Sequence, residues 1–237
     1  MEAQVIIAWA ALGLGALALV FGVVFGVRAF RLARVLSSTP PTPIPALEAG
    51  LHEVRGVVHG EGSVESPLSR QACVYWRMII EQRRRNRWET LVDKREAVPC
   101  WLDDGGGRVA ISPIDADVIV TLSARGTGGI FGFPSAELSE VLERLGASPD
   151  GMVGPYLRYR EEVVTPGDRL HAVGTAVSVG EGWEMRKDND VYVISDRDEA
   201  DMVANQERLA VRWAGLAVAG ALALAWGFLN GGVAALL

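Results

Sequence analysis

The chain has 237 residues, of which 49% are hydrophobic, and a formal net charge of −6. The apolar residues gather at the two ends, which excludes an ordinary globular domain over the whole length. Residues 35–207 hold 18 basic and 28 acidic residues, a net charge of −10. This charge disfavours general nucleic-acid binding, because basic side chains on phosphates supply most of that affinity.

Residues 1–4 form a short tail, and residues 5–27 are predicted to form a first transmembrane helix. Val5 to Val27 contains no charged residue and at about 1.5 Å per residue reaches about 34 Å, enough to cross a hydrocarbon core of about 30 Å. The alternative, a cleaved signal peptide, needs basic residues before the apolar run. Here Arg28, Arg31 and Arg34 follow it, which favours a span.

Residues 28–46 combine this basic flank with a proline-rich spacer. The stretch from Ser37 to Pro45 contains four prolines, which disfavour both a helix and a central strand. We expect an extended, stiff segment that lifts the following domain a short distance from the membrane.

Residues 47–207 are predicted to form a mainly β (α+β) soluble domain, a small β-barrel or a sandwich-like fold with one inserted helix. Alternating apolar residues predict the strands Glu53–Gly60, Ala72–Glu81, Trp88–Val98, Trp101–Asp103, Arg108–Pro113, Val118–Leu122, Leu157–Val164, Arg169–Val179, Trp183–Arg186 and Val191–Ile194. Hairpin turns are expected at Arg83–Arg87 and Asp104–Gly107. An apolar stripe between Pro134 and Gly146 predicts the helix.

Residues 208–237 are predicted to supply a basic flank and a second transmembrane helix. Trp213 to Leu237 is uncharged and longer than a buried core helix usually needs. Arg208 and Arg212 precede it, and neither outer end carries a base. Because basic residues near spans are retained on the cytoplasmic side, we expect a two-pass integral protein of the cell membrane with a cytoplasmic domain.

Small residues recur every four positions in both predicted spans. The positions are Ala18, Gly22, Gly26, Ala217, Ala221 and Ala225. Such stripes let helix backbones approach closely. They predict helix packing within one chain, or a homo-oligomer formed through the transmembrane helices, and the alternative is the general abundance of Gly and Ala.

No motif predicts catalysis, a metal or a cofactor. Asp103–Gly105 and Asp188–Asp190 lack the ligand spacing of a calcium loop and read as turns. The glycine-rich stretch Gly126–Gly132 fits neither the dinucleotide pattern nor the P-loop. The three histidines and two cysteines have no zinc-site spacing, and there is no Gly-x-Ser-x-Gly elbow. Cys73 and Cys100 are expected to be packed thiols.

One basic cluster stands out in this acidic domain. It consists of Arg83, Arg84, Arg85 and Arg87. The functional hypothesis is contact with membrane lipids or with an acidic protein partner, and the alternative is a solvated hairpin tip.

Several segments together resemble the GIDE domain, which lies between two transmembrane helices in mitochondrial-anchored RING ubiquitin ligases and in many prokaryotic membrane proteins. The segments include Leu51–Val58, Cys73–Trp76, Val98–Pro113 and Arg160–Glu162. The residues that carry the resemblance are Arg55, Gly56, Ser66, Pro67, Leu68, Cys73, Tyr75, Trp76, Trp88, Pro99, Asp103, Gly107, Pro113, Glu161, Gly167, Asp168 and Gly174.

The resemblance implies a role in ubiquitin transfer, where a C-terminal zinc RING performs the chemistry. No RING follows the second predicted span in this sequence. We therefore expect a recognition or scaffold domain that binds a protein or lipid partner without catalysis of its own. The alternative is a ligase-like protein that needs a RING partner in trans. The mitochondrial relatives place this domain in the intermembrane space, whereas the flanking arginines here favour the cytoplasm.

Overall fold

The computed structural model describes residues 2–127, 136–147, 157–188, 191–197 and 199–232. The chain divides into two units, each treated by itself below. One unit contains residues 1–38 and 198–237, and the other contains residues 39–197.

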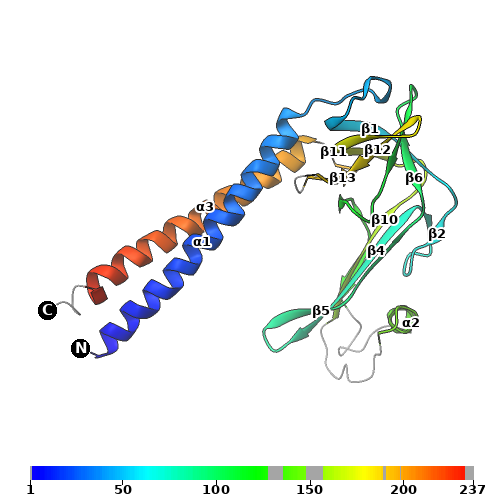
Figure 1. Ribbon diagram of the computed structural model, residues 1–237. Coiled ribbons are helices and arrows are strands. Elements are labelled where there is room, and N and C mark those ends of the chain that lie inside the picture. The colour runs from blue at the N-terminus through cyan, green and yellow to red at the C-terminus, as the bar shows by residue number, and fades with distance from the viewer. Residues whose placement is uncertain (1, 128–135, 148–156, 189–190, 198, 233–237) are drawn as a thin grey trace. The chain divides into compact units, whose positions relative to one another are not determined.

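The first unit is a pair of long helices, α1 (Glu2–Ser38) and α3 (Glu199–Gly227), which run side by side (Figure 1). A π-helical turn, Phe228–Gly232, follows α3. Ile6–Arg31 and Gln206–Asn230 are long and apolar enough to cross a membrane by length and composition. Large apolar side chains point outward from both helices, as they would in lipid.

The helices meet along a seam of small residues. A Cβ atom added to Gly22 would lie 2.6 Å from the Ala217 nitrogen, and one added to Gly220 would lie 2.7 Å from the Gly15 oxygen. Glycine is therefore required for the backbones to approach this closely. Among the described residues, the buried positions of α1 are Ala8, Gly15, Gly22, Ala29 and Ala33, of which the first four recur every seven residues.

Five strands of the second unit close into a barrel. They are β1 (Gly50–Gly60), β6 (Cys100–Asp103), β7 (Arg108–Ile111), β11 (Arg169–Val179) and β12 (Gly182–Arg186). Their order is β1-β6-β7-β12-β11, and β11 pairs back onto β1; only β7 and β12 are parallel among these neighbours. This is the Greek-key order of five-stranded OB-type barrels. The prediction of a mainly β fold is confirmed, with a barrel as its form.

The barrel core is apolar, and short strands extend the sheet around it. Buried core residues include Val54, Val58, Leu102 and Tyr192. The extensions are β13 (Val193–Ser195), which pairs with β11, and β8 (Asp117–Ile119), which pairs with β13. A small ladder, β2 (Val64–Glu65) with β3 (Ala72–Cys73), lies in the link between β1 and β4.

A second sheet is assembled from two insertions in the barrel. Its order is β5 (Arg87–Ala97), β4 (Tyr75–Arg84), β10 (Leu157–Val164) and β9 (Leu122–Thr127), all antiparallel. The β4–β5 hairpin is inserted between the first two barrel strands, and β9 and β10 are inserted between the third and fourth. Segments distant in sequence thus share one sheet (Figure 1).

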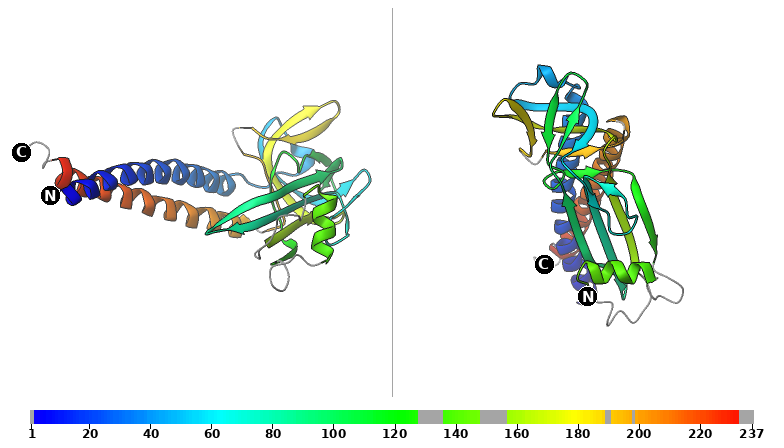
Figure 2. Two further views of the ribbon diagram at one scale, coloured as in Figure 1. Left: turned by 90° about the horizontal axis from the view of Figure 1, so that it is seen from below. Right: turned by 90° about the vertical axis from the view of Figure 1, so that its right-hand side faces the viewer.

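Helix α2 (Ala136–Arg144) lies across one face of this sheet (Figure 2). Its buried Leu138, Val141 and Leu142 pack against residues of that face such as Met78 and Ile80. The helix ends at Arg144, and the turn that follows contains Gly146, whose φ of +72° favours glycine. The Lys94 ammonium donates to the Leu145 carbonyl at 2.6 Å, which stabilises this end.

The predicted hairpins at Arg83–Arg87 and Asp104–Gly107 are confirmed by the pairings of β4 with β5 and of β6 with β7. The spacer differs from the expectation. Ile44–Ala46 forms a 3-10 helix, Ile44 is only 2% exposed in the barrel core, and its N–H donates to Asp104 Oδ2 at 2.7 Å. An apolar side chain between prolines is better placed in the core than in water, so this end of the spacer belongs to the barrel.

Candidate recognition surface

The face of the four-stranded sheet opposite α2, here called the open face, carries many arginines in an acidic domain. Alternate residues of each strand point to this face, so residues distant in the sequence become neighbours on it through strand pairing. Its arginines are Arg77, Arg83, Arg95, Arg125, Arg158 and Arg160. Its acids are Glu81, Asp93 and Glu162.

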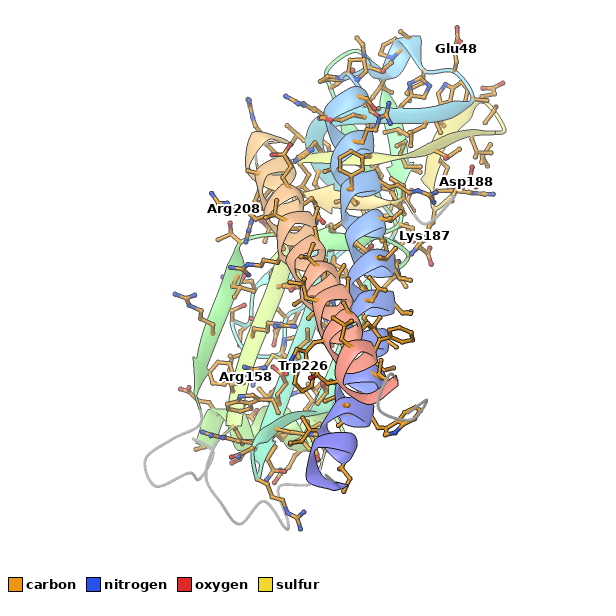
Figure 3. The ribbon with its side chains drawn as sticks, turned by 90° about the vertical axis from the view of Figure 1, so that its left-hand side faces the viewer. Glu48, Arg158, Lys187, Asp188, Arg208 and Trp226 are labelled. Atoms are coloured by element: carbon orange, nitrogen blue, oxygen red, sulfur yellow. The ribbon has the colours of Figure 1, made fainter. Side chains whose placement is uncertain are left out.

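Two of these arginines hold carboxylates with both arms of the guanidinium. Arg77 Nε and Nη2 donate to the two Asp93 oxygens, each at 2.8 Å. Arg158 donates to Glu81 at 2.6 and 2.8 Å and also stacks over the Trp88 ring at 4.3 Å. Hydrogen bonding to Arg77 and Arg158 holds the pKa of Asp93 and of Glu81 below the ordinary value. Arg158 can be located in Figure 3.

Like charges face one another on the rest of this surface. Arg160 lies directly opposite Arg125, and Arg77 lies directly opposite Arg95. Directly opposed like charges destabilise a sheet. Acids lie among these arginines: Asp93 is attracted to Arg95 and Arg160 as well as to Arg77, whereas burial raises the pKa of Glu162 against the attraction of Arg77 and Arg160. Within the described residues, Arg95, Arg125 and Arg160 are exposed and form no ion pair with a carboxylate.

The arginine cluster expected from the sequence lies at the tip of the β4–β5 hairpin. Arg83 lies opposite Trp88 on the open face. Arg85 and Arg87 are exposed, and Arg85 has a φ of +54°, uncommon for a residue other than glycine. The side chain of Arg84 lies outside the described part of the chain. The tip is therefore one corner of a wider basic face.

Sequence reasoning missed the rest of that face. Arg158 and Arg160 are two residues apart on one strand, and Arg77 and Glu81 are four residues apart on another, so each pair shares a face, and this even spacing is visible in the sequence. The sequence does not give the strand register that brings β4, β5, β9 and β10 together. Charged residues at even spacing on several predicted strands were the available signal for a charged sheet face.

The residues that carry the family resemblance have structural positions in the second unit. Glu161 is fully buried and accepts hydrogen bonds from the Leu68 and Ser69 N–H groups at 2.7 and 2.9 Å. Ser66 Oγ lies 2.7 Å from Ser69 Oγ, and the Pro67 carbonyl accepts from Arg144 at 3.3 Å. These contacts fix the loop between β2 and β3.

Other motif residues shape turns and close contacts. Asp103 accepts from Gly105 N–H at 2.8 Å and from Arg108 at 2.9 Å in the β6–β7 hairpin that contains Gly107. Asp168 accepts from Thr165 N–H at 2.7 Å in the turn where Gly167 has a φ of +97°. Arg55 donates to Glu53. Gly56 and Gly174 lie where a Cβ would meet Asp103 backbone and the Tyr192 ring.

The remaining motif residues are mostly buried. Tyr75, Trp76 and Pro113 are buried, whereas Pro99 is exposed and Trp88 is 37% exposed. The thiols of Cys73 and Cys100 are free and buried, and they donate to the Val64 and Ile111 carbonyls. Burial raises the pKa of each to about 11, which keeps both unreactive near neutral pH.

The structure brings together some of the small residues predicted to pack the helices. Gly22 contacts Ala217, and Ala18 lies close to Gly220. Gly26 lies near Trp213. Ala221 and Ala225 are exposed on this helix pair.

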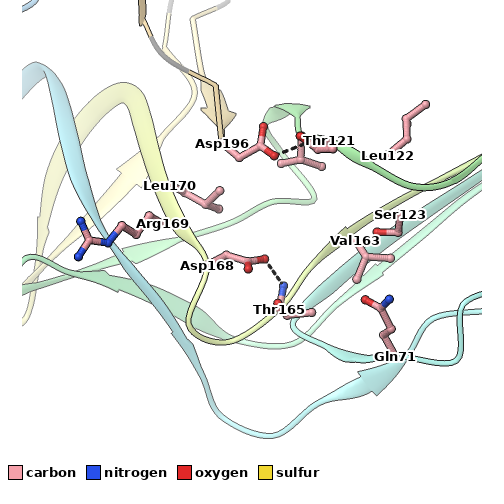
Figure 4. Close-up of a pocket in the computed structure, with 11 residues that line it drawn as sticks. Gln71, Thr121, Leu122, Ser123, Val163, Thr165, Asp168, Arg169, Leu170 and Asp196 are labelled. Carbon is pink, nitrogen blue, oxygen red and sulfur yellow. Dashed lines mark hydrogen bonds between the residues drawn. The ribbon is translucent and has the colours of Figure 1, made fainter.

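A pocket of about 400 Å³ opens beside the turn between β10 and β11 (Figure 4). Its two carboxylates are Asp168 and Asp196. Each already accepts a backbone hydrogen bond at 2.7 Å, from Thr165 and Thr121 respectively. These acids therefore serve to fix the surrounding loops.

Glu53 is a fully buried acid on the barrel. Its Oε1 lies 2.7 Å from Arg55 Nε and 3.5 Å from His171 Nδ1, and its Oε2 has no partner among the described residues. Burial acts to raise the pKa of this carboxyl, but His171 and Arg55 outweigh it, so the pKa lies below the ordinary 4.5.

Because this pKa is lowered on folding, ionised Glu53 stabilises the fold above the unfolded pKa, and the contribution disappears as pH falls through the folded pKa. We expect Glu53→Gln to melt at a lower temperature than the wild type at about pH 7, and the difference to shrink toward about pH 3. Thermal melts across that range check this, and a difference independent of pH would contradict it.

These observations define a class: a β-barrel domain with a basic sheet face, joined to two terminal helices that could span a membrane. A model of the GIDE family, described as an E3 ubiquitin ligase, matches residues 76–230, more than half of the chain. The chain therefore belongs to the GIDE family, a membrane-associated domain found with E3 ligases. Neither a curated protein nor a solved structure matches it.

Proposed function

We propose that this chain is a membrane-anchored recognition module that binds a protein partner through the open face. One observation carries the proposal. Arg95, Arg125 and Arg160 are exposed and form no ion pair among the described residues, in a domain whose net charge is −10. Directly opposed arginines lower the stability of the sheet. An anionic partner that pairs with them would remove the repulsion and add charge-assisted hydrogen bonds.

The anchoring part of the proposal rests on the two long apolar helices. Both ends of the second unit are connected to them, so a bound partner would be held beside the bilayer. The flanking arginines Arg28, Arg31, Arg34, Arg208 and Arg212 support a cytoplasmic domain. The module itself needs no catalytic residue.

The test compares two triple variants of the full-length chain, recovered from its native membranes in nanodiscs. Arg95→Ser/Arg125→Ser/Arg160→Ser removes the unpaired arginines. Arg169→Ser/Arg186→Ser/Lys187→Ser removes the same charge from exposed barrel positions. We expect proteins that copurify with the wild type and the barrel variant to be lost from the open-face variant. An identical set of proteins with all three chains would overturn the proposal.

A second candidate function follows from the family description. The chain would act as a ubiquitin-ligase subunit that recruits a RING partner in trans, with the open face or another surface holding the substrate. It predicts a stoichiometric RING protein or charged conjugating enzyme in the same nanodisc preparation. Absence of both, with other partners present, would remove this candidate.

A further inference from the structure

The open face shows which anion it fits. Arg77 with Asp93 and Arg158 with Glu81 are both two-point pairs in which a planar guanidinium matches a carboxylate. Each pair joins neighbouring strands of the sheet. The surface therefore already binds carboxylates at the spacing of its own ladder.

The unpaired arginines lie on the same ladder. Arg125 on β9 lies directly opposite Arg160 on β10, and Arg95 on β5 lies directly opposite Arg77 on β4. Neighbouring strands are about 4.8 Å apart, and alternate residues on one strand are about 6.8 Å apart. Arg95, Arg125 and Arg160 stand on three different strands, so a peptide that reaches all three crosses the strands. The alternate side chains of an extended peptide are also about 6.8 Å apart, a spacing that long guanidinium side chains can follow. Exposed Trp88 adds an apolar contact near the hairpin tip.

We propose that the open face binds an extended, carboxylate-rich peptide segment of a partner protein, whose acidic side chains pair with Arg95, Arg125 and Arg160. This assignment rests on the proposed function and names the partner's chemistry. In the complex the opposed arginines face carboxylates, so the repulsion within the sheet becomes an attraction across the interface.

The negative net charge of the domain favours binding of a short acidic peptide over binding of an anionic membrane or a nucleic acid. Residues 35–207 carry a net charge of −10. An anionic bilayer or a nucleic acid extends well beyond the face and is repelled by the remaining acids. A segment of about ten residues covers the arginines alone, and beyond about 10 Å the other charges are screened.

The experiment uses the full-length chain in nanodiscs of zwitterionic lipid and a fluorescent twelve-residue peptide of alternating Glu and Ser. A peptide with Gln in place of Glu is the control ligand. We expect anisotropy to report binding of the Glu peptide only, weakened about tenfold by Arg95→Ser/Arg125→Ser/Arg160→Ser. The barrel variant Arg169→Ser/Arg186→Ser/Lys187→Ser should bind like the wild type.

Thermal melts separate lost binding from lost folding. Because the open-face variant removes opposed like charges, it should melt no lower than the wild type. A lower melting temperature would overturn the claim that this face is strained without a partner.

The other outcomes also decide. Equal binding of the Glu peptide by the two triple variants would overturn the assignment to this face. Arginine-dependent recruitment of phosphatidylserine vesicles, with no peptide binding, would assign the face to lipid instead. If the Glu peptide does not bind but the copurifying proteins still depend on the three arginines, the peptide assignment is wrong and the proposed recognition function is retained.

Discussion

Replacing Gly56 with valine is expected to destabilise the barrel by about 3 kcal/mol or more, the upper end of overpacking costs. A Cβ at Gly56 would lie 2.7 Å from the Asp103 carbonyl oxygen and 2.9 Å from the Asp103 nitrogen. Both are backbone atoms at the end of β6, next to the pairing of Val57 with Asp103. Relief therefore requires strands β1 and β6 to move apart at the point where Val57 pairs with both β6 and β11.

The matched control is Gly182→Ala in β12. An added Cβ there has only the Val179 oxygen near it, at 3.8 Å. We expect Gly182→Ala to melt within a few degrees of the wild type and Gly56→Val to melt about 10 °C lower. Near-UV circular dichroism of the full-length chain in nanodiscs measures both, and equal melting temperatures would refute the close contact.

Glu161→Ala is expected to be comparably destabilising, by about 3 kcal/mol or more. The carboxylate of Glu161 is 0% exposed and accepts hydrogen bonds from two N–H groups, those of Leu68 and Ser69. Removing it leaves two donors without an acceptor, and each orphaned donor costs about 1–3 kcal/mol. The loop between β2 and β3 would then lose its attachment to the four-stranded sheet.

Glu96→Ala provides the comparison, because Glu96 is an exposed acid on β5 of the same sheet. Its loss should change the melting temperature little. Proteolysis offers a second readout, since the freed loop near Ser69 should become the first site of cleavage in Glu161→Ala alone. A Glu161→Ala protein as stable and as resistant as Glu96→Ala would show that these two hydrogen bonds contribute nothing.

The sequence predicted most strands because their apolar residues alternate. Leu157–Val164 and Arg169–Val179 match the observed strands residue for residue. The bounds of the predicted strand Val118–Leu122 were wrong, because β8 ends at Ile119 and β9 begins at Leu122. The rest of β9 was missed, because Ala124 and Gly126 have low strand propensity. It forms because it pairs along the free edge of β10.

The arginine surface was only partly predictable, for a physical reason. The run Arg83–Arg87 is contiguous in sequence and was found. Arg125 and Arg160 become neighbours only through the β9–β10 register, which local patterns do not contain. The helix seam shows the same limit. The four-residue stripe predicts close approach, and its α1 members Ala18, Gly22 and Gly26 lie near α3. Its α3 members Ala221 and Ala225 are exposed, and the contact of Gly15 with Gly220 lies outside the predicted stripe.

The most direct test of the open face as the binding surface is to locate a bound acidic peptide. A photoreactive diazirine placed within the Glu-Ser peptide would be activated on the full-length chain in nanodiscs, and the labelled positions read by mass spectrometry. The account predicts labels within residues 75–97, 122–127 and 157–164. Labels concentrated on the barrel strands 50–60 and 169–186 would contradict it.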